Sequence, residues 1–138
     1  MTEEITFTPI NFSKPDEKAS KEYEDVMNAA LDFVNTKMLA LPNLKEIIGA
    51  GNKATMLENH KNHALFINAF IKEFDTKVLP ATVAWVFKVY TSRGFKQEYW
   101  TIQLSLWQEA LRELMSEHGY SQISPIYKWM IANINAAD

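Results

Sequence analysis

The 138-residue sequence contains no cysteine, and its only arginines are Arg93 and Arg112. Without cysteine there can be no disulfide, thiolate metal site or cysteine nucleophile. Arginine is the usual bidentate reader of phosphates and guanines, and a formal net charge of −3 gives no long-range attraction for nucleic acid or anionic lipid. We therefore expect no nucleic-acid partner.

Signals for secretion, membrane insertion and common catalytic folds are also lacking. The N-terminus, M-T-E-E-I-T-F, has acidic residues where a signal peptide needs a basic region, and no apolar run approaches the roughly 18 residues of a membrane span. There are only four glycines, with no G-x-S-x-G elbow and no glycine-rich phosphate loop. We expect a cytoplasmic protein that is not an enzyme and does not enter a membrane.

What the sequence does contain is a rich supply of apolar residues. Of its residues, 47% are hydrophobic and 12% aromatic, enough for one buried core in a chain of this length. No repeat, low-complexity tract or linker divides the chain. We predict a single helical domain over residues 1–138, in which residues 1–12 form an extended or disordered N-terminal arm.

Apolar residues recur at steps of three and four along most of the chain, the spacing that places them on one face of a helix. This pattern predicts an all-α fold, a single compact bundle of five to six helices. The expected segments are Ser13 to Met38, a short one between Pro42 and Gly49, Asn52 to Phe74, Asp75 or Thr76 to Gly94, Phe95 to Glu117 with Gly119 as its terminator, and a last helix that opens at Pro125.

The segment V-A-W-V-F-K-V-Y, residues 83–90, is apolar on every side apart from Lys88. Its composition would also suit a strand, but both neighbouring segments read as helices, and an isolated strand would leave its backbone unpaired. A helix that is apolar all round is typical of the middle of a bundle. We therefore expect residues 77–93 to form the central helix.

His60 and His63 are two of the three histidines, and both fall on the apolar stripe of the predicted helix 52–74. A buried imidazole needs partners for its ring nitrogens. One interpretation is a pair of histidines at the edge of the core, bonded to backbone or to tyrosine hydroxyls. The other is a metal or haem site, but stable metal sites take three or four ligands, and neither H-E-x-x-H nor a pair of E-x-x-H motifs is present.

A second unusual feature is the corner from Tyr90 to Trp100, which carries Arg93, Gly94 and several large rings. In one interpretation Gly94 supplies a left-handed turn and the rings fill the bundle. In the other, Trp85 and Tyr90 line a pocket and Arg93 offers a fixed charge to an anionic group.

The order of a tyrosine-ended helix, then R-G-F-x-x-E-Y-W, then a helix with Leu104 and Trp107, resembles the corner of bacterial globin-like sensor domains, including non-haem globin type input domains of stress-signalling proteins. The resemblance covers roughly residues 53–117. In haem-bearing members the iron-ligating histidine lies about four residues before this glycine, where the present sequence has Tyr90. The resemblance implies a globin-like arrangement of the helices, preferred over a four-helix bundle, without haem. It also implies a role in signal transduction.

The preferred function is a non-enzymatic sensory or ligand-binding module that has no cofactor and acts through a protein partner or as a homodimer. Its ligand would be a small apolar or anionic molecule. The first alternative is a haem- or metal-binding globin-like protein that uses His60 or His63. The second is a protein interaction scaffold with no small ligand. The residues predicted to bind the ligand are His60, His63, Trp85, Tyr90, Arg93 and Trp107.

Overall fold

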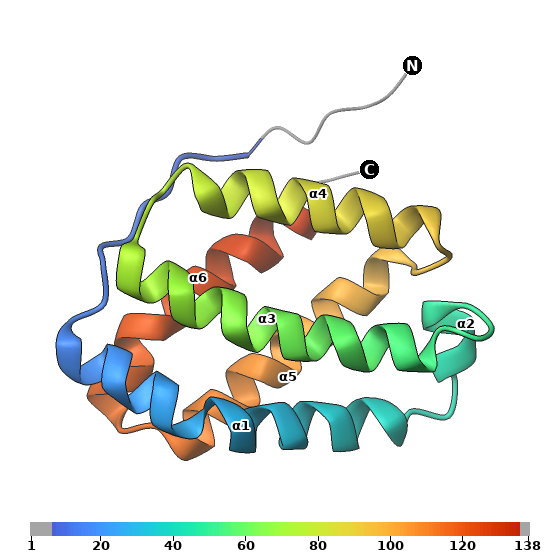
Figure 1. Cartoon of the computed structure of the whole chain (residues 1–138), viewed down its shortest axis with the longest axis horizontal. Coiled ribbons are helices and arrows are strands. Elements are labelled where there is room, and N and C mark those ends of the chain that lie inside the picture. The colour runs from blue at the N-terminus through green and yellow to red at the C-terminus, as the bar shows by residue number, and fades with distance from the viewer. Residues whose placement is uncertain (1–6, 136–138) are drawn as a thin grey trace.

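The computed structural model describes residues 7–135 of the chain, and within this range it contains no strand. The predicted all-α bundle of five to six helices is confirmed. None of the helices in this range is both long and apolar enough to cross a membrane. The helices are α1 (Glu17–Leu39), α2 (Leu44–Ile48), α3 (Lys53–Glu73), α4 (Val78–Ser92), α5 (Gln97–Leu114) and α6 (Glu117–Asn135) (Figure 1).

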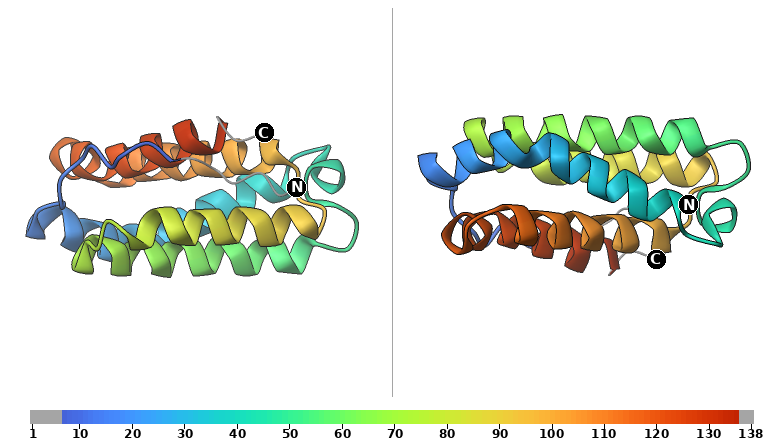
Figure 2. Two further views of the ribbon diagram at one scale, coloured as in Figure 1. Left: turned by 90° about the horizontal axis from the view of Figure 1, so that it is seen from above. Right: turned by 90° about the horizontal axis from the view of Figure 1, so that it is seen from below.

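The long helices form two layers, seen edge-on in Figure 2. The helices α3 and α4 lie side by side in one layer, and α5 and α6 form the other layer at an angle to the first (Figures 1 and 2). The helix α1 runs obliquely between them and packs against α3, α5 and α6. The core is therefore centred on α1 and α5, where Tyr23, Val34, Tyr99 and Trp107 are fully buried.

The expectation that residues 77–93 form the central helix is wrong. The helix α4 packs only sparsely against its neighbours, and its buried residues are Leu79 and Val83. Val78 is 41% exposed and Trp85 is 64% exposed. The apolar composition of α4 is therefore not explained by burial in the bundle. The helix α4 is an apolar helix at the edge of the fold that carries exposed apolar side chains.

The predicted boundary between the last two helices is also wrong. The fifth helix ends at Leu114, and α6 begins at Glu117 and runs through both Gly119 and Pro125. The side chain of Ser116 accepts a hydrogen bond from the Gly119 backbone N–H at 3.0 Å, as a residue that caps a helix N-terminus does. A Cβ atom at position 119 would lie 2.6 Å from a carboxylate oxygen of Glu22, so Gly119 leaves room for that side chain rather than ending a helix.

The segment before α1 packs against the bundle. Asp16 caps α1 by accepting a hydrogen bond from the backbone N–H of Ala19 at 2.8 Å, three residues after the predicted start at Ser13. In the predicted arm, Phe7 stacks on Trp129 with ring centroids 5.5 Å apart. The remainder of that arm, residues 1–6, lies outside the described residues.

Candidate functional site

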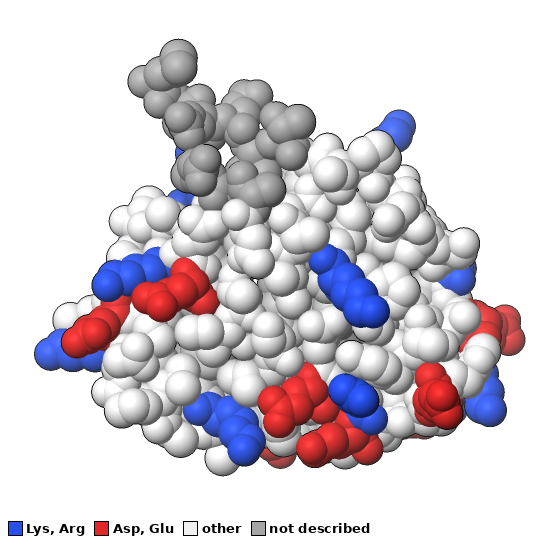
Figure 3. All heavy atoms as spheres, turned by 180° about the vertical axis from the view of Figure 1, so that it is seen from behind, with Lys and Arg blue, Asp and Glu red and all other residues white. Residues whose placement is uncertain are grey.

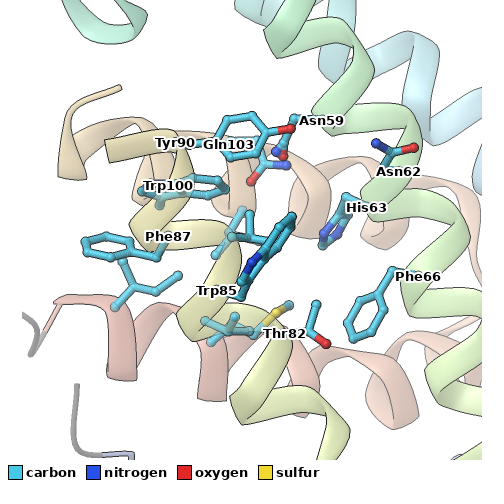
Figure 4. Close-up of a pocket in the computed structure, with 15 residues that line it drawn as sticks. Asn59, Asn62, His63, Phe66, Thr82, Trp85, Phe87, Tyr90, Trp100 and Gln103 are labelled. Carbon is cyan, nitrogen blue, oxygen red and sulfur yellow. The ribbon is translucent and has the colours of Figure 1, made fainter. Parts of the chain in front are cut away.

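A cavity of about 180 Å³ lies between α4 and the rest of the bundle (Figure 4). It exists because α4 stands away from α3, α5 and α6 instead of packing closely against them. Most of its walls are aromatic or aliphatic, as is usual in pockets for small molecules. The residues that line it are Asn59, Asn62, His63, Phe66, Thr82, Val83, Trp85, Val86, Phe87, Tyr90, Trp100, Gln103, Leu104, Met130 and Ile134.

Polar side chains gather at one end of this cavity, where Figure 4 shows Asn59, Tyr90 and Gln103 close to one another. Asn59 is 5% exposed and Gln103 is 1% exposed. The Nδ2 atom of Asn59 and both amide atoms of Gln103 have no hydrogen-bond partner among the described residues, and neither has the indole Nε1 of Trp100. A buried amide without a partner costs about 1–3 kcal/mol, so this end of the cavity offers unusually strong hydrogen-bonding potential.

His63 lies in the wall of the cavity, and its ring is fixed by contacts with Tyr127 and Trp107. Its Nε2 atom and the Tyr127 hydroxyl are 2.8 Å apart, and its ring packs against Trp107 with centroids 4.9 Å apart. Burial lowers the pKa of His63 to about 3, and the nearby His60 adds to this shift. The imidazole is therefore neutral near pH 7, and it presents an uncharged wall to the cavity.

His60 belongs to the core and does not line the cavity. It is fully buried, its Nδ1 atom lies 2.7 Å from the side-chain oxygen of Asn35, and its ring stacks on Tyr99 with centroids 6.0 Å apart. Burial lowers the pKa of His60 to about 4. Both histidines thus face inward, but only His63 reaches the cavity.

Trp85 lies where the cavity opens to solvent, because it lines the cavity and is nevertheless largely exposed. Tyr90 lines the same cavity from the last turn of α4, and its ring packs edge-on against Trp100 with centroids 5.7 Å apart. Trp107 is fully buried and lies behind His63, outside the lining. Three of the six predicted residues, His63, Trp85 and Tyr90, are therefore brought together at the cavity.

Arg93 follows α4 at an exposed corner and does not line the cavity. Its guanidinium lies 5.9 Å from the centre of the Tyr90 ring, on the outside. The corner itself is fixed by the backbone: Gly94 has a φ of +106°, as predicted for a left-handed turn, and the Asn52 side chain donates a hydrogen bond to the Arg93 carbonyl at 2.9 Å. The charge of Arg93 is not directed at a ligand in the cavity.

Sequence reasoning missed Asn59, Trp100 and Gln103 as site residues. The spacing could have indicated that Gln103 is buried, since Trp100, Gln103 and Trp107 follow one another at steps of three and four and so share one face of α5. Asn59 likewise lies one turn before His63. A glutamine on a tryptophan stripe marks a buried amide that needs a partner.

Charge is absent from the cavity wall and mixed on the face formed by α5 and α6 (Figure 3). No Asp, Glu, Lys or Arg lines the cavity. On the face formed by α5 and α6, basic and acidic side chains lie among one another without a patch of one sign (Figure 3). This face offers no basic surface for a phosphate backbone, and the cavity favours a neutral ligand because an unpaired buried charge is costly.

The residues around the histidines do not fit a metal ion or a haem. No group of three or more His, Asp or Glu side chains within residues 7–135 is placed to hold a metal. His63 Nε2 and His60 Nδ1 are engaged by Tyr127 and Asn35, and the unpaired His60 Nε2 is a single ligand atom where a stable metal site takes three or four. A cavity of about 180 Å³ is also smaller than the roughly 300–1,000 Å³ of pockets for drug-sized ligands, and a haem is larger still.

Comparisons with protein-family models, with curated proteins and with solved structures found no match for this chain.

Replacing Gln103 should stabilise the protein. Methionine has a similar length and removes both unpaired amide atoms, so we expect Gln103→Met to raise the free energy of unfolding by about 1–2 kcal/mol. Urea unfolding of the two proteins at pH 7 measures this difference. Gln108→Met, on the same helix but at a partly exposed position, is the matched control and should change stability by less than about 0.5 kcal/mol. A loss of stability in Gln103→Met would show that the amide is already satisfied within the fold.

Proposed function

We propose that this chain is a non-enzymatic ligand-binding module whose ligand is a small, neutral and mainly apolar molecule held between α4 and the rest of the bundle. The observation that carries the proposal is one cavity that combines apolar walls with the buried, unpaired amides of Asn59 and Gln103. Apolar walls provide affinity, and a few convergent polar groups fix the orientation of a ligand. A ligand in this cavity could form hydrogen bonds with the unpaired amides.

The size of the cavity limits the ligand. An apolar protein cavity of about 150 Å³ is large enough to bind benzene. At about 180 Å³ the present cavity suits a molecule of one or two fused rings. The neutral His63 and the absence of charged lining residues favour an apolar ligand over an anionic one.

A sensory role follows if the ligand shifts the position of α4. A ligand that contacts α4 together with α3, α5 and α6 has its highest affinity for the arrangement in which α4 lies against these helices. Its binding therefore increases the population of that arrangement. Val78 and Trp85 on the exposed surface of α4 would pass this change to a protein partner or to a second copy in the cytoplasm. The resemblance to globin-like sensor domains supports this role.

A ligand-free interaction scaffold is the second candidate, and the same exposed side chains of Val78 and Trp85 favour it. The two candidates differ in one property that can be measured directly. A scaffold has no affinity for small molecules in the cavity, whereas a ligand-binding module does.

Titration with indole, followed by calorimetry, separates these candidates. We expect one indole to bind per chain with a Kd on the order of 0.1 mM, as suits a ligand of nine heavy atoms. Val86→Phe places a ring in the cavity and should weaken binding at least tenfold. Val89→Phe is the matched control, because Val89 is a partly buried valine of the same helix that does not line the cavity.

Two outcomes would contradict the ligand-binding proposal. One is the absence of indole binding at millimolar concentration, which would favour the scaffold. The other is equal loss of binding in Val86→Phe and Val89→Phe, which would place the bound indole elsewhere on α4.

A further inference from the structure

We infer that the ligand is a flat heterocycle with a lactam edge, that is, a ring N–H donor directly beside a C=O acceptor. The inference rests on the proposed function and specifies the class of molecule that the cavity takes. It comes from the kind, number and location of the hydrogen-bonding atoms that the protein leaves unpaired at one end of the cavity.

The carboxamide of Gln103 defines the complementary group. Both its Nε2 donor and its Oε1 acceptor are buried and unpaired, and they belong to one planar group. A ligand group that pairs with both must present an acceptor and a donor side by side in one plane. A lactam does this with its C=O and N–H, whereas an ether, ketone or hydrocarbon leaves at least one of the two atoms unpaired.

Additional donors favour a carbonyl oxygen as the acceptor. Asn59 Nδ2 and Trp100 Nε1, on two other residues that line the cavity, are also unpaired. Together with Gln103 Nε2 they make three donors that lack an acceptor, against one acceptor, Gln103 Oε1, that lacks a donor. A carbonyl oxygen has two lone pairs and accepts from two donors at once. A lactam carbonyl therefore matches the excess of donors better than a second N–H group would.

The aromatic side chains near these polar atoms favour a flat ring. Tyr90 and Phe87 pack around Trp100, with ring centroids 5.7 Å and 6.3 Å from it, and all three line the cavity. Aromatic walls contact a planar ligand over a large area. Because no charged residue lines the cavity, a carboxylate or ammonium group on the ligand would be buried without a partner.

The test compares three bicyclic probes by calorimetry: 2-quinolone, which has a lactam edge, 1-methyl-2-quinolone, in which the donor is blocked, and naphthalene, which has neither polar group. We expect the wild-type protein to bind 2-quinolone about tenfold more tightly than 1-methyl-2-quinolone, which corresponds to one to two hydrogen bonds. Gln103→Met should lose this preference while it still binds naphthalene. Gln108→Met should keep the preference.

The outcomes separate this inference from the proposed function. If naphthalene binds but the two quinolones bind equally well, the cavity is a ligand site and the lactam inference is overturned. If Gln103→Met still prefers 2-quinolone over 1-methyl-2-quinolone, the methyl group weakens binding through its size and not through the loss of a donor. The lactam inference is then also overturned. If none of the three probes binds to any variant, the proposed function itself fails.

Discussion

As the pH falls from 6.5 towards 4, the protein should lose stability steeply. Burial holds the pKa of His60 at about 4 and that of His63 at about 3, whereas an unfolded histidine titrates near pH 6.5. Between these values the unfolded chain binds protons that the folded chain does not, so stability rises with pH in this window and is fully present only above pH 6.5. Each histidine contributes up to about 1.4 kcal/mol per pH unit.

Urea unfolding at pH 7, 6, 5 and 4.5 measures this loss. The pKa values of Asp16, Glu22 and Glu24 are also lowered in the folded protein, but the stability that these carboxylates contribute is lost mainly below pH 4.5, so the range above 4.5 reports mainly on histidine. His63→Gln should reduce the loss of unfolding free energy between pH 7 and 4.5 by about half, whatever the substitution does to stability at pH 7. His118→Gln is the control, because His118 is exposed and pairs with Asp16.

A flat stability profile between pH 7 and 4.5 in the wild-type protein would mean that the folded state accepts protons on both histidines. That result would contradict their placement as neutral groups in the core and in the cavity wall. An equal flattening by His118→Gln would also contradict the account, because the loss of stability would then not be specific to the buried imidazoles.

Trp107→Ala should cost about 3–5 kcal/mol of unfolding free energy, because Trp107 is fully buried and its removal leaves a void beside His63. Trp85→Ala is the matched substitution on the exposed helix. It should change stability by less than about 1 kcal/mol, since Trp85 is 64% exposed, but it should weaken indole binding.

Chemical denaturation of both variants, together with indole titration of Trp85→Ala, checks this contrast. If Trp107→Ala does not fold, Trp107→Phe should still lose stability and keep the cavity. The assignment of one tryptophan to the core and the other to the mouth of the cavity would be wrong if the two alanine substitutions cost the same, or if Trp85→Ala bound indole like the wild type.

The helices could be predicted from the sequence because apolar spacing is a local signal. The stripe on α3 that carries His60 and His63 does face inward, and the left-handed turn at Gly94 was predicted from the glycine alone. The spacing could not show that only His63 reaches a cavity. That depends on how far α4 stands from α3, which is a property of the tertiary packing.

The position of α4 was mispredicted for a physical reason. Apolar residues on all sides of a helix indicate burial only if the helix has no other use for an apolar surface, such as contact with a partner or the wall of a cavity. Here Val78 and Trp85 remain at the surface and the inner face of the helix closes a cavity. Similarly, the sequence alone made Gly119 look like a helix terminator. Its actual role is to leave room for the Glu22 side chain, which comes from α1, about 100 residues away in the sequence, and this close approach is a property of the tertiary structure.

The central claim is that the cavity beneath α4 binds a small neutral ligand, and the four tryptophans give a direct test. The same indole titration can be followed by NMR through the indole N–H signals of the ¹⁵N-labelled protein. Trp100 and Trp85 line the cavity, whereas Trp129 donates its N–H to the Thr8 carbonyl at 3.2 Å and stacks on Phe7, outside the lining. We predict saturable shifts of the Trp100 and Trp85 signals with little change at Trp129. Unchanged Trp100 and Trp85 signals at saturating indole, or larger shifts at Trp129, would contradict the claim.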